Sequence, residues 1–129
     1  MKKYGVLICL ILATFMFMSC ALFQKVKTDP MTSATGAYKM AGEIIISSNE
    51  TAKQLRISGK ITDVQVVKYN ELLAKTKAAY SLAGNSLKLY INATDAVEKK
   101  EYLLSFQGLA TQAGDLANQI VAFLTEVNK

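Results

Sequence analysis

The chain of 129 residues contains no histidine and no tryptophan, a single proline and two cysteines. Histidine is the commonest general base and metal ligand, so its absence excludes Ser–His–Asp and Cys–His arrangements. Cys9 lies inside an apolar leader and Cys20 lies at its end, which leaves the rest of the chain without a thiol. We therefore expect no catalytic, cofactor or metal site, and we interpret the protein as a non-enzyme.

Clustered positive charge is also lacking. The formal net charge is +5, of which Lys2 and Lys3 supply two charges, and Arg56 is the single arginine. Proteins that bind nucleic acid usually gather lysine and arginine on one face. We therefore expect no nucleic-acid partner.

The first twenty residues are the most informative part of the sequence. Lys2 and Lys3 precede the uncharged, apolar stretch 6–18, and Ser19-Cys20 follows at once. A run of about 13 apolar residues is short for a hydrocarbon core ~30 Å thick. Basic residues, then an apolar stretch, then small residues are typical of a secretory signal.

The segment Phe17-Met18-Ser19-Cys20 resembles the lipobox of bacterial lipoproteins, in which a small residue precedes the lipidated cysteine. The resemblance covers residues 1–20. It implies a signal peptide over 1–19, a lipid such as palmitate on Cys20, and a membrane-bound protein of the cell envelope. Because Ala21 and not Asp follows the cysteine, it also implies sorting to the outer membrane in a Gram-negative host, facing the periplasm or the cell surface.

Two other interpretations of this segment stay open. Ser19-Cys20-Ala21 also fits an ordinary signal-peptidase site, at which cleavage after Ala21 would discard the cysteine. The apolar run 6–23 is also just long enough for an uncleaved anchor with Lys2 and Lys3 inside. All three interpretations place residues 24–129 beyond the inner membrane.

Residues 20–29 form a short tether, and residues 30–129 form one domain of three predicted helices. The first helix begins with Asp29 as its N-cap and ends at Ser58-Gly59. Capping patterns at 62–65 and 95–98 predict the starts of the second and third helices.

Short connections near Gly59 and Asn92 force neighbouring helices to run antiparallel. We therefore predict an all-α fold, an up-down-up antiparallel three-helix bundle of long helices. We find no sequence repeat. Apolar and small residues spaced three and four apart predict the buried stripes. In chain order these stripes are Ala34, Tyr38, Ala41, Ile45, Ser48, Ala52 and Leu55; Val66, Tyr69, Leu73, Thr76, Tyr80, Ala83, Leu87 and Tyr90; and Leu103, Phe106, Ala110, Ala113, Ala117, Ile120, Leu124 and Val127.

Two groups of residues in the stripes could carry a function. Tyr69, Tyr80 and Tyr90 share a face, which favours core packing and, as the alternative, a surface that binds a ligand. A run of small residues in the third helix favours close packing within the bundle or, as the alternative, docking with another chain. That run consists of Gly108, Ala110, Ala113, Gly114 and Ala117.

Six apolar residues lie off the predicted stripes, and those that share a surface would mark a protein contact. We therefore expect a small cell-envelope lipoprotein whose bundle is a structural or protein-interaction module. Its partner would be an envelope protein or a second copy. The alternative is a ligand-binding or an exclusion- or immunity-type inhibitory lipoprotein. The six residues are Ile44, Ile46, Leu72, Leu82, Leu104 and Leu109.

Overall fold

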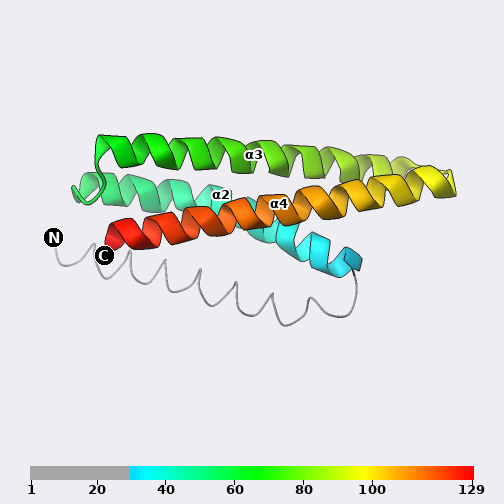
Figure 1. Cartoon of the computed structure of the whole chain (residues 1–129), viewed down its shortest axis with the longest axis horizontal. Helices are drawn as coiled ribbons and strands as arrows, with labels where there is room; N and C mark the ends of the chain where they lie inside the picture. Colours follow the sequence, from blue (N-terminus) through cyan, green and yellow to red (C-terminus); the bar gives the residue numbers. More distant parts are fainter. Residues whose placement is uncertain (1–29) are drawn as a thin grey trace.

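The computed structural model describes residues 30–129, which form three helices joined by two short turns. Helix α2 covers Pro30–Ile57, α3 covers Asp63–Asn92 and α4 covers Ala96–Asn128. Consecutive helices run antiparallel (Figure 1). The prediction of an all-α, up-down-up three-helix bundle of long helices is therefore confirmed.

The predicted features of the N-terminal part cannot be located in this structure. The signal peptide 1–19, the lipidation residue Cys20, the tether 20–29 and the N-cap Asp29 lie outside the described residues.

The turn between α2 and α3 depends on Gly59. This glycine has a φ of 71°, in the left-handed region that side chains with a Cβ rarely adopt. The amide of Lys60 donates to the carbonyl of Leu55 at 2.9 Å, and the amide of Gly59 donates to the carbonyl of Arg56 at 3.1 Å. These two bonds form a Schellman motif, which satisfies the last carbonyls of α2.

Side chains cap the N-termini of the other two helices. The Gln65 amide donates to the Thr62 hydroxyl, and the Gln65 side chain accepts from the Thr62 amide, which forms the predicted capping box. At the start of α4 the Glu98 amide donates to the Asp95 carboxylate at 3.1 Å. Each cap satisfies a backbone donor that the helix itself leaves unpaired.

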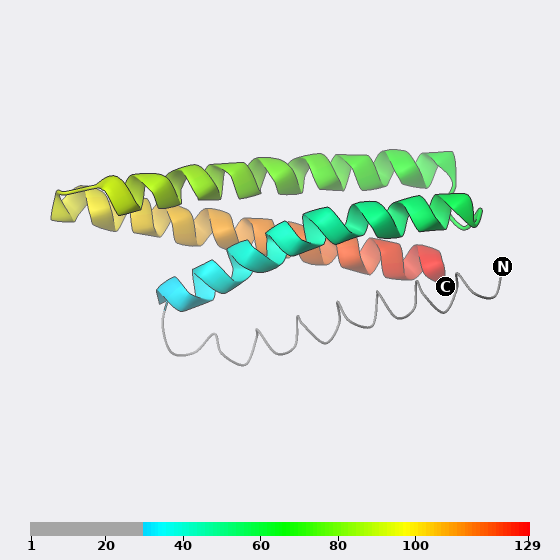
Figure 2. The ribbon, with the colours of Figure 1, turned by 180° about the vertical axis from the view of Figure 1, so that it is seen from behind.

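The three helices do not cover one another equally. Helices α3 and α4 lie side by side as a hairpin, whereas α2 crosses them obliquely and packs chiefly against α4 (Figures 1 and 2). The N-terminus of α2 stops short of the turn between α3 and α4. Residues 87–105, which we call the hairpin tip, therefore lack a third helix, and none of them is buried.

The stripe predicted for α4 forms the centre of the core. The ring of Phe106 is fully buried, as predicted. Five further positions of that stripe, each at most 1% exposed, are Ala110, Ala113, Ala117, Ile120 and Leu124.

The stripe predicted for α2 is partly wrong. Ile44 and Thr51 are buried, while the predicted Ile45 and Ala52 are only half-buried. The buried face is wider and turned by one residue, because α2 packs chiefly against α4 and also contacts α3. In α3 the same displacement buries Ala79 and Ser86 more deeply than the predicted Tyr80 and Leu87.

Candidate functional site

A pair of stacked tyrosines marks the place where α2 crosses α3. The rings of Tyr38 and Tyr80 are parallel to within 3°, and their centroids lie 4.4 Å apart. The ring of Phe106 from α4 meets Tyr38 edge-on at 5.8 Å. All three helices therefore contribute one aromatic ring to this crossing.

Two glycines make the close approach at the crossing possible. A Cβ atom on Gly84 would lie 2.9 Å from the hydroxyl oxygen of Tyr38, and one on Gly42 would lie 3.0 Å from that of Tyr80. Each tyrosine thus lies over the glycine of the opposite helix. A Cβ atom at Gly84 would force the Tyr38 ring to shift, and one at Gly42 would require the Tyr80 ring to give by a few tenths of an ångström.

The sequence carries a signal for this crossing that is separate from the hydrophobic periodicity. The segments AYKMAG, residues 37–42, and AYSLAG, residues 79–84, share four identical positions, and the fourth position is Met in one and Leu in the other. Our finding of no repeat was therefore wrong. Because the two helices are antiparallel, the two copies face each other, and each tyrosine meets the glycine of the other copy.

The crossing also changes the acidity of one phenol. Hydrogen bonding with Tyr80, with a contribution from burial, raises the pKa of Tyr38 to about 12. Both effects favour the neutral phenol over the phenolate.

A third tyrosine, Tyr69, forms polar contacts between α3 and α2. Its hydroxyl lies 3.0 Å from the Ser48 hydroxyl and donates to the Asn49 side-chain oxygen at 3.0 Å. Burial raises the pKa of Tyr69, and the hydrogen bond with Ser48 opposes that rise. The contact joins α3 to α2 between the aromatic crossing and the turn that connects these two helices.

The tyrosines predicted to share one face therefore lie in three different surroundings. Tyr69 is in the core, Tyr80 is stacked at the crossing, and Tyr90 is half-buried in the hairpin tip, where the Lys99 ammonium lies 5.5 Å from its ring. The arrangement fits the packing interpretation, since Tyr69 and Tyr80 pack against different residues of α2 while Tyr90 lies against Lys99 of α4.

The small residues of α4 pack within the bundle. A Cβ atom on Gly114 would lie 3.4 Å from the Ala37 Cβ of α2, so this position lies at a close helix–helix contact. Ala110, Ala113 and Ala117 are fully buried. Gly108 differs, because it is exposed and a Cβ there would meet nothing within 4 Å.

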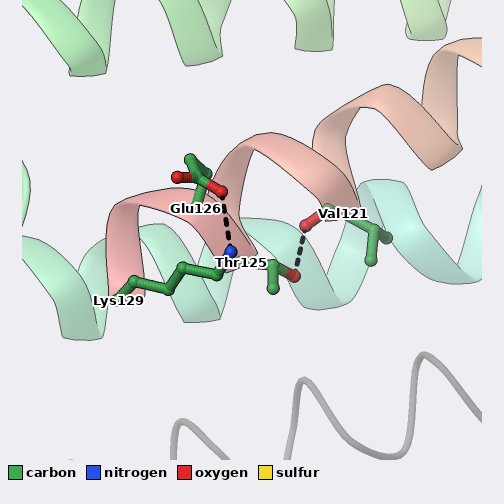
Figure 3. A network of polar contacts seen from close by, with 4 residues as sticks. All are labelled: Val121, Thr125, Glu126 and Lys129. Atoms are coloured by element: carbon green, nitrogen blue, oxygen red, sulfur yellow. Dashed lines mark hydrogen bonds and ion pairs between the residues drawn. The ribbon is translucent and has the colours of Figure 1, made fainter.

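Acidic side chains in the described part of the chain are dispersed. Among residues 30–129 no group of three His, Cys, Asp or Glu side chains could hold a metal ion. Asp115 is exposed. At the end of α4 the Lys129 ammonium lies 3.2 Å from the Glu126 carboxylate, next to a bond from the Thr125 hydroxyl to the Val121 carbonyl (Figure 3). Both members of this ion pair are exposed, so it contributes little stability.

Exposed apolar side chains gather at the two ends of the molecule. Leu89, Ile91, Val97 and Leu104 lie in the hairpin tip. At the opposite end, Ile57 is the last residue of α2, and Val64 and Val67 lie near the N-terminus of α3. We call these three residues the α2–α3 patch. Of the six residues off the predicted stripes, Ile46, Leu82 and Leu104 are exposed, Leu72 and Leu109 are half-buried, and Ile44 is buried.

No helix within residues 30–129 is both long and apolar enough to cross a membrane. No protein-family model, curated protein or solved structure matches the chain.

Proposed function

We propose that the protein is a small cell-envelope lipoprotein, anchored through Cys20, whose helical bundle is a non-catalytic protein-interaction module. The anchor rests on the basic, apolar and small-residue order of the first twenty residues. The interaction role rests on exposed apolar side chains held on a well-packed bundle, since such patches often mark protein contacts.

The α2–α3 patch is the surface that we assign to a protein partner. The tether joins α2 at its N-terminus, and the patch lies at the other end of α2, roughly 42 Å away for 28 residues at 1.5 Å each. Val64 is 81% exposed and Ile57 is 65% exposed. An anchored bundle that stands on its tether would present these residues to a neighbouring envelope protein.

Metabolic labelling with a fatty acid tests the anchor. The native protein and Cys9→Ser should take up label, whereas Cys20→Ser should not, because Cys9 lies within the predicted signal peptide. Equal labelling of Cys20→Ser and the native protein would contradict lipidation at Cys20.

Site-specific photo-crosslinking in cells tests the interaction role. A photoreactive residue in place of Val64 should give a discrete protein adduct, and one in place of Lys75, an exposed position further along α3, should not. Adding Val67→Asp should abolish the Val64 adduct, because a carboxylate would interrupt the apolar surface. A lipidated protein that gives no adduct at Val64 would contradict the assignment of this patch.

A further inference from the structure

The hairpin tip carries apolar side chains that nothing in the described structure covers. Ile91 and Val97 flank the turn between α3 and α4, and each is 65% exposed. Leu89 is about half exposed, and Tyr90 and Tyr102 are half-buried beside them. This turn therefore presents aliphatic and aromatic side chains at the extremity of the molecule.

The tip lies at the same end of the bundle as the N-terminus of α2, which the tether precedes in the chain. Ala34, in the first turns of α2, packs in one cluster with Ala83 and Phe106 of the hairpin. From this cluster toward the turn, α3 and α4 each extend for about ten more residues, roughly 15 Å. From Ala34 in the same direction, α2 extends only to Pro30, roughly 6 Å. The turn between α3 and α4 thus projects roughly 10 Å beyond the point where the tether joins the bundle (Figures 1 and 2).

The length of the tether places a membrane within reach of the tip. Residues 20–29 are ten residues, and a chain of that length spans at most roughly 36 Å when fully extended. A lipid on Cys20 therefore holds the N-terminal end of α2 within roughly 36 Å of the bilayer, with the hairpin tip at the same end of the bundle. The α2–α3 patch lies roughly 42 Å further along α2, so the anchor holds it less closely to the bilayer than it holds the tip.

We propose that the hairpin tip docks on the lipid surface that holds the Cys20 acyl chains, an inference that rests on the lipid anchor of the proposed function. Ile91 and Val97 enter the interface, and Tyr90 and Tyr102 lie at the level of the headgroups, where aromatic side chains with a polar end are favoured. The anchor keeps the tip at a high effective concentration near the bilayer, so a contact too weak to bind alone becomes occupied.

The charge of the tip indicates which lipid property matters. Three lysines and three acidic residues lie within residues 87–105, so the segment is neutral overall. Attraction of a polybasic segment to anionic lipid is therefore not available to it. Docking depends on burial of apolar side chains and is nearly independent of the headgroup charge. The six charged residues are Lys88, Asp95, Glu98, Lys99, Lys100 and Glu101.

The absence of tryptophan from the chain permits a direct test. The lipidated full-length protein carrying Ile91→Trp would be reconstituted in phosphatidylcholine vesicles with and without brominated acyl chains. Ile91→Trp should show a blue-shifted emission and at least a twofold quenching by the brominated lipid. The matched control is Val64→Trp at the opposite end, which should show neither effect.

Three further measurements make the test decisive. Adding Val97→Lys to Ile91→Trp should remove most of the quenching, with the far-UV circular dichroism unchanged. Vesicles with anionic phosphatidylglycerol should give quenching within twofold of the neutral vesicles, and quenching on anionic vesicles alone would overturn the apolar mechanism. A blue shift without quenching, together with a dimer by sedimentation in detergent, would overturn the proposal in favour of a second copy on the tip.

Fatty-acid labelling and vesicle flotation of the same samples separate the two proposals. A protein that lacks label and does not float reports failure of the anchor. A labelled protein that floats while Ile91→Trp stays unquenched reports failure of the docking alone.

Discussion

Substitution of Gly84 by alanine tests whether the aromatic crossing constrains the packing of α2 on α3. Two opposing effects determine the outcome. Alanine is favoured over glycine in a helix interior by about 1 kcal/mol. Against this, the new Cβ would lie 2.9 Å from the Tyr38 hydroxyl oxygen, closer than real Cβ contacts come.

The Tyr38 ring cannot move without losing contacts. It is stacked on Tyr80 and meets the edge of Phe106, and aromatic pairs of this kind contribute about 0.5–1.5 kcal/mol each. Extra atoms in a packed interior typically cost about 1–3 kcal/mol. After subtraction of the propensity gain, Gly84→Ala should lower the free energy of unfolding by about 0–2 kcal/mol.

Gly108 supplies the matched control. It is an exposed helical glycine of α4 at which a Cβ would meet nothing within 4 Å. Gly108→Ala should therefore raise the free energy of unfolding by about 1 kcal/mol, the propensity gain alone. The two substitutions should differ by about 1–3 kcal/mol in urea unfolding of residues 24–129, followed by circular dichroism.

A second background isolates the hydroxyl contact. Tyr38→Phe removes the oxygen, and the ring carbon Cζ then lies nearest, 3.7 Å from the alanine Cβ in the present geometry. In that background Gly84→Ala should stabilise the protein about as much as Gly108→Ala does. If Gly84→Ala in the native background is as stabilising as Gly108→Ala, the aromatic crossing does not constrain the packing of α2 on α3.

Two further predictions concern Phe106 and Tyr38. Phe106 is fully buried, so Phe106→Ala should cost about 3–5 kcal/mol in urea unfolding, and a loss below about 1 kcal/mol would contradict its place in the core. Because the pKa of Tyr38 is raised to about 12, the neutral phenol stabilises the fold fully below pH 10, and this contribution is lost as the pH rises from 10 through 12. Tyr80→Phe removes the main cause and should lower the pKa of Tyr38 toward 10 in an absorbance titration at 295 nm; an unchanged titration curve would show that Tyr80 is not the cause.

The ends of the helices could be predicted from the sequence because each depends on residues close together in the chain. Thr62 and Gln65 cap α3 across three positions, and Asp95 and Glu98 do the same for α4. Gly59 reverses the chain by itself, through a backbone conformation that other residues avoid. None of these signals requires knowledge of the tertiary structure.

The lateral arrangement could not be predicted in the same way. The stripe of α4 is buried from Phe106 to Leu124, as predicted, but Ile44 of α2 was placed off its stripe and is buried. The buried face of α2 depends on the oblique crossing, and hydrophobic periodicity does not contain the crossing angle. The paired Tyr and Gly positions at 38–42 and 80–84 do indicate where α2 and α3 meet. They form only a short repeat, shared by two segments far apart in the chain.

The exposed hairpin tip was not predicted either, because it also depends on how the helices are arranged in space. Three helices of similar length are expected to pack along their whole length. Residues 87–105 lack contact with a third helix because α2 begins short of them. Leu104 was expected off the stripe, whereas Tyr90 and Leu103 were expected in it and are only half-buried.

The hydrogen bonds of Tyr69 decide the alignment of α2 along α3. A core rich in alanine and leucine tolerates several alignments, because aliphatic contacts have little directional preference. Sliding α2 by one turn, about 5.4 Å, would separate Ser48 and Asn49 from the Tyr69 hydroxyl. A buried hydroxyl left without a partner costs about 1–3 kcal/mol, a penalty that falls only on misaligned states. The Tyr69 hydroxyl thereby favours one register of α2 along α3, and with it how far the hairpin tip projects beyond the N-terminus of α2.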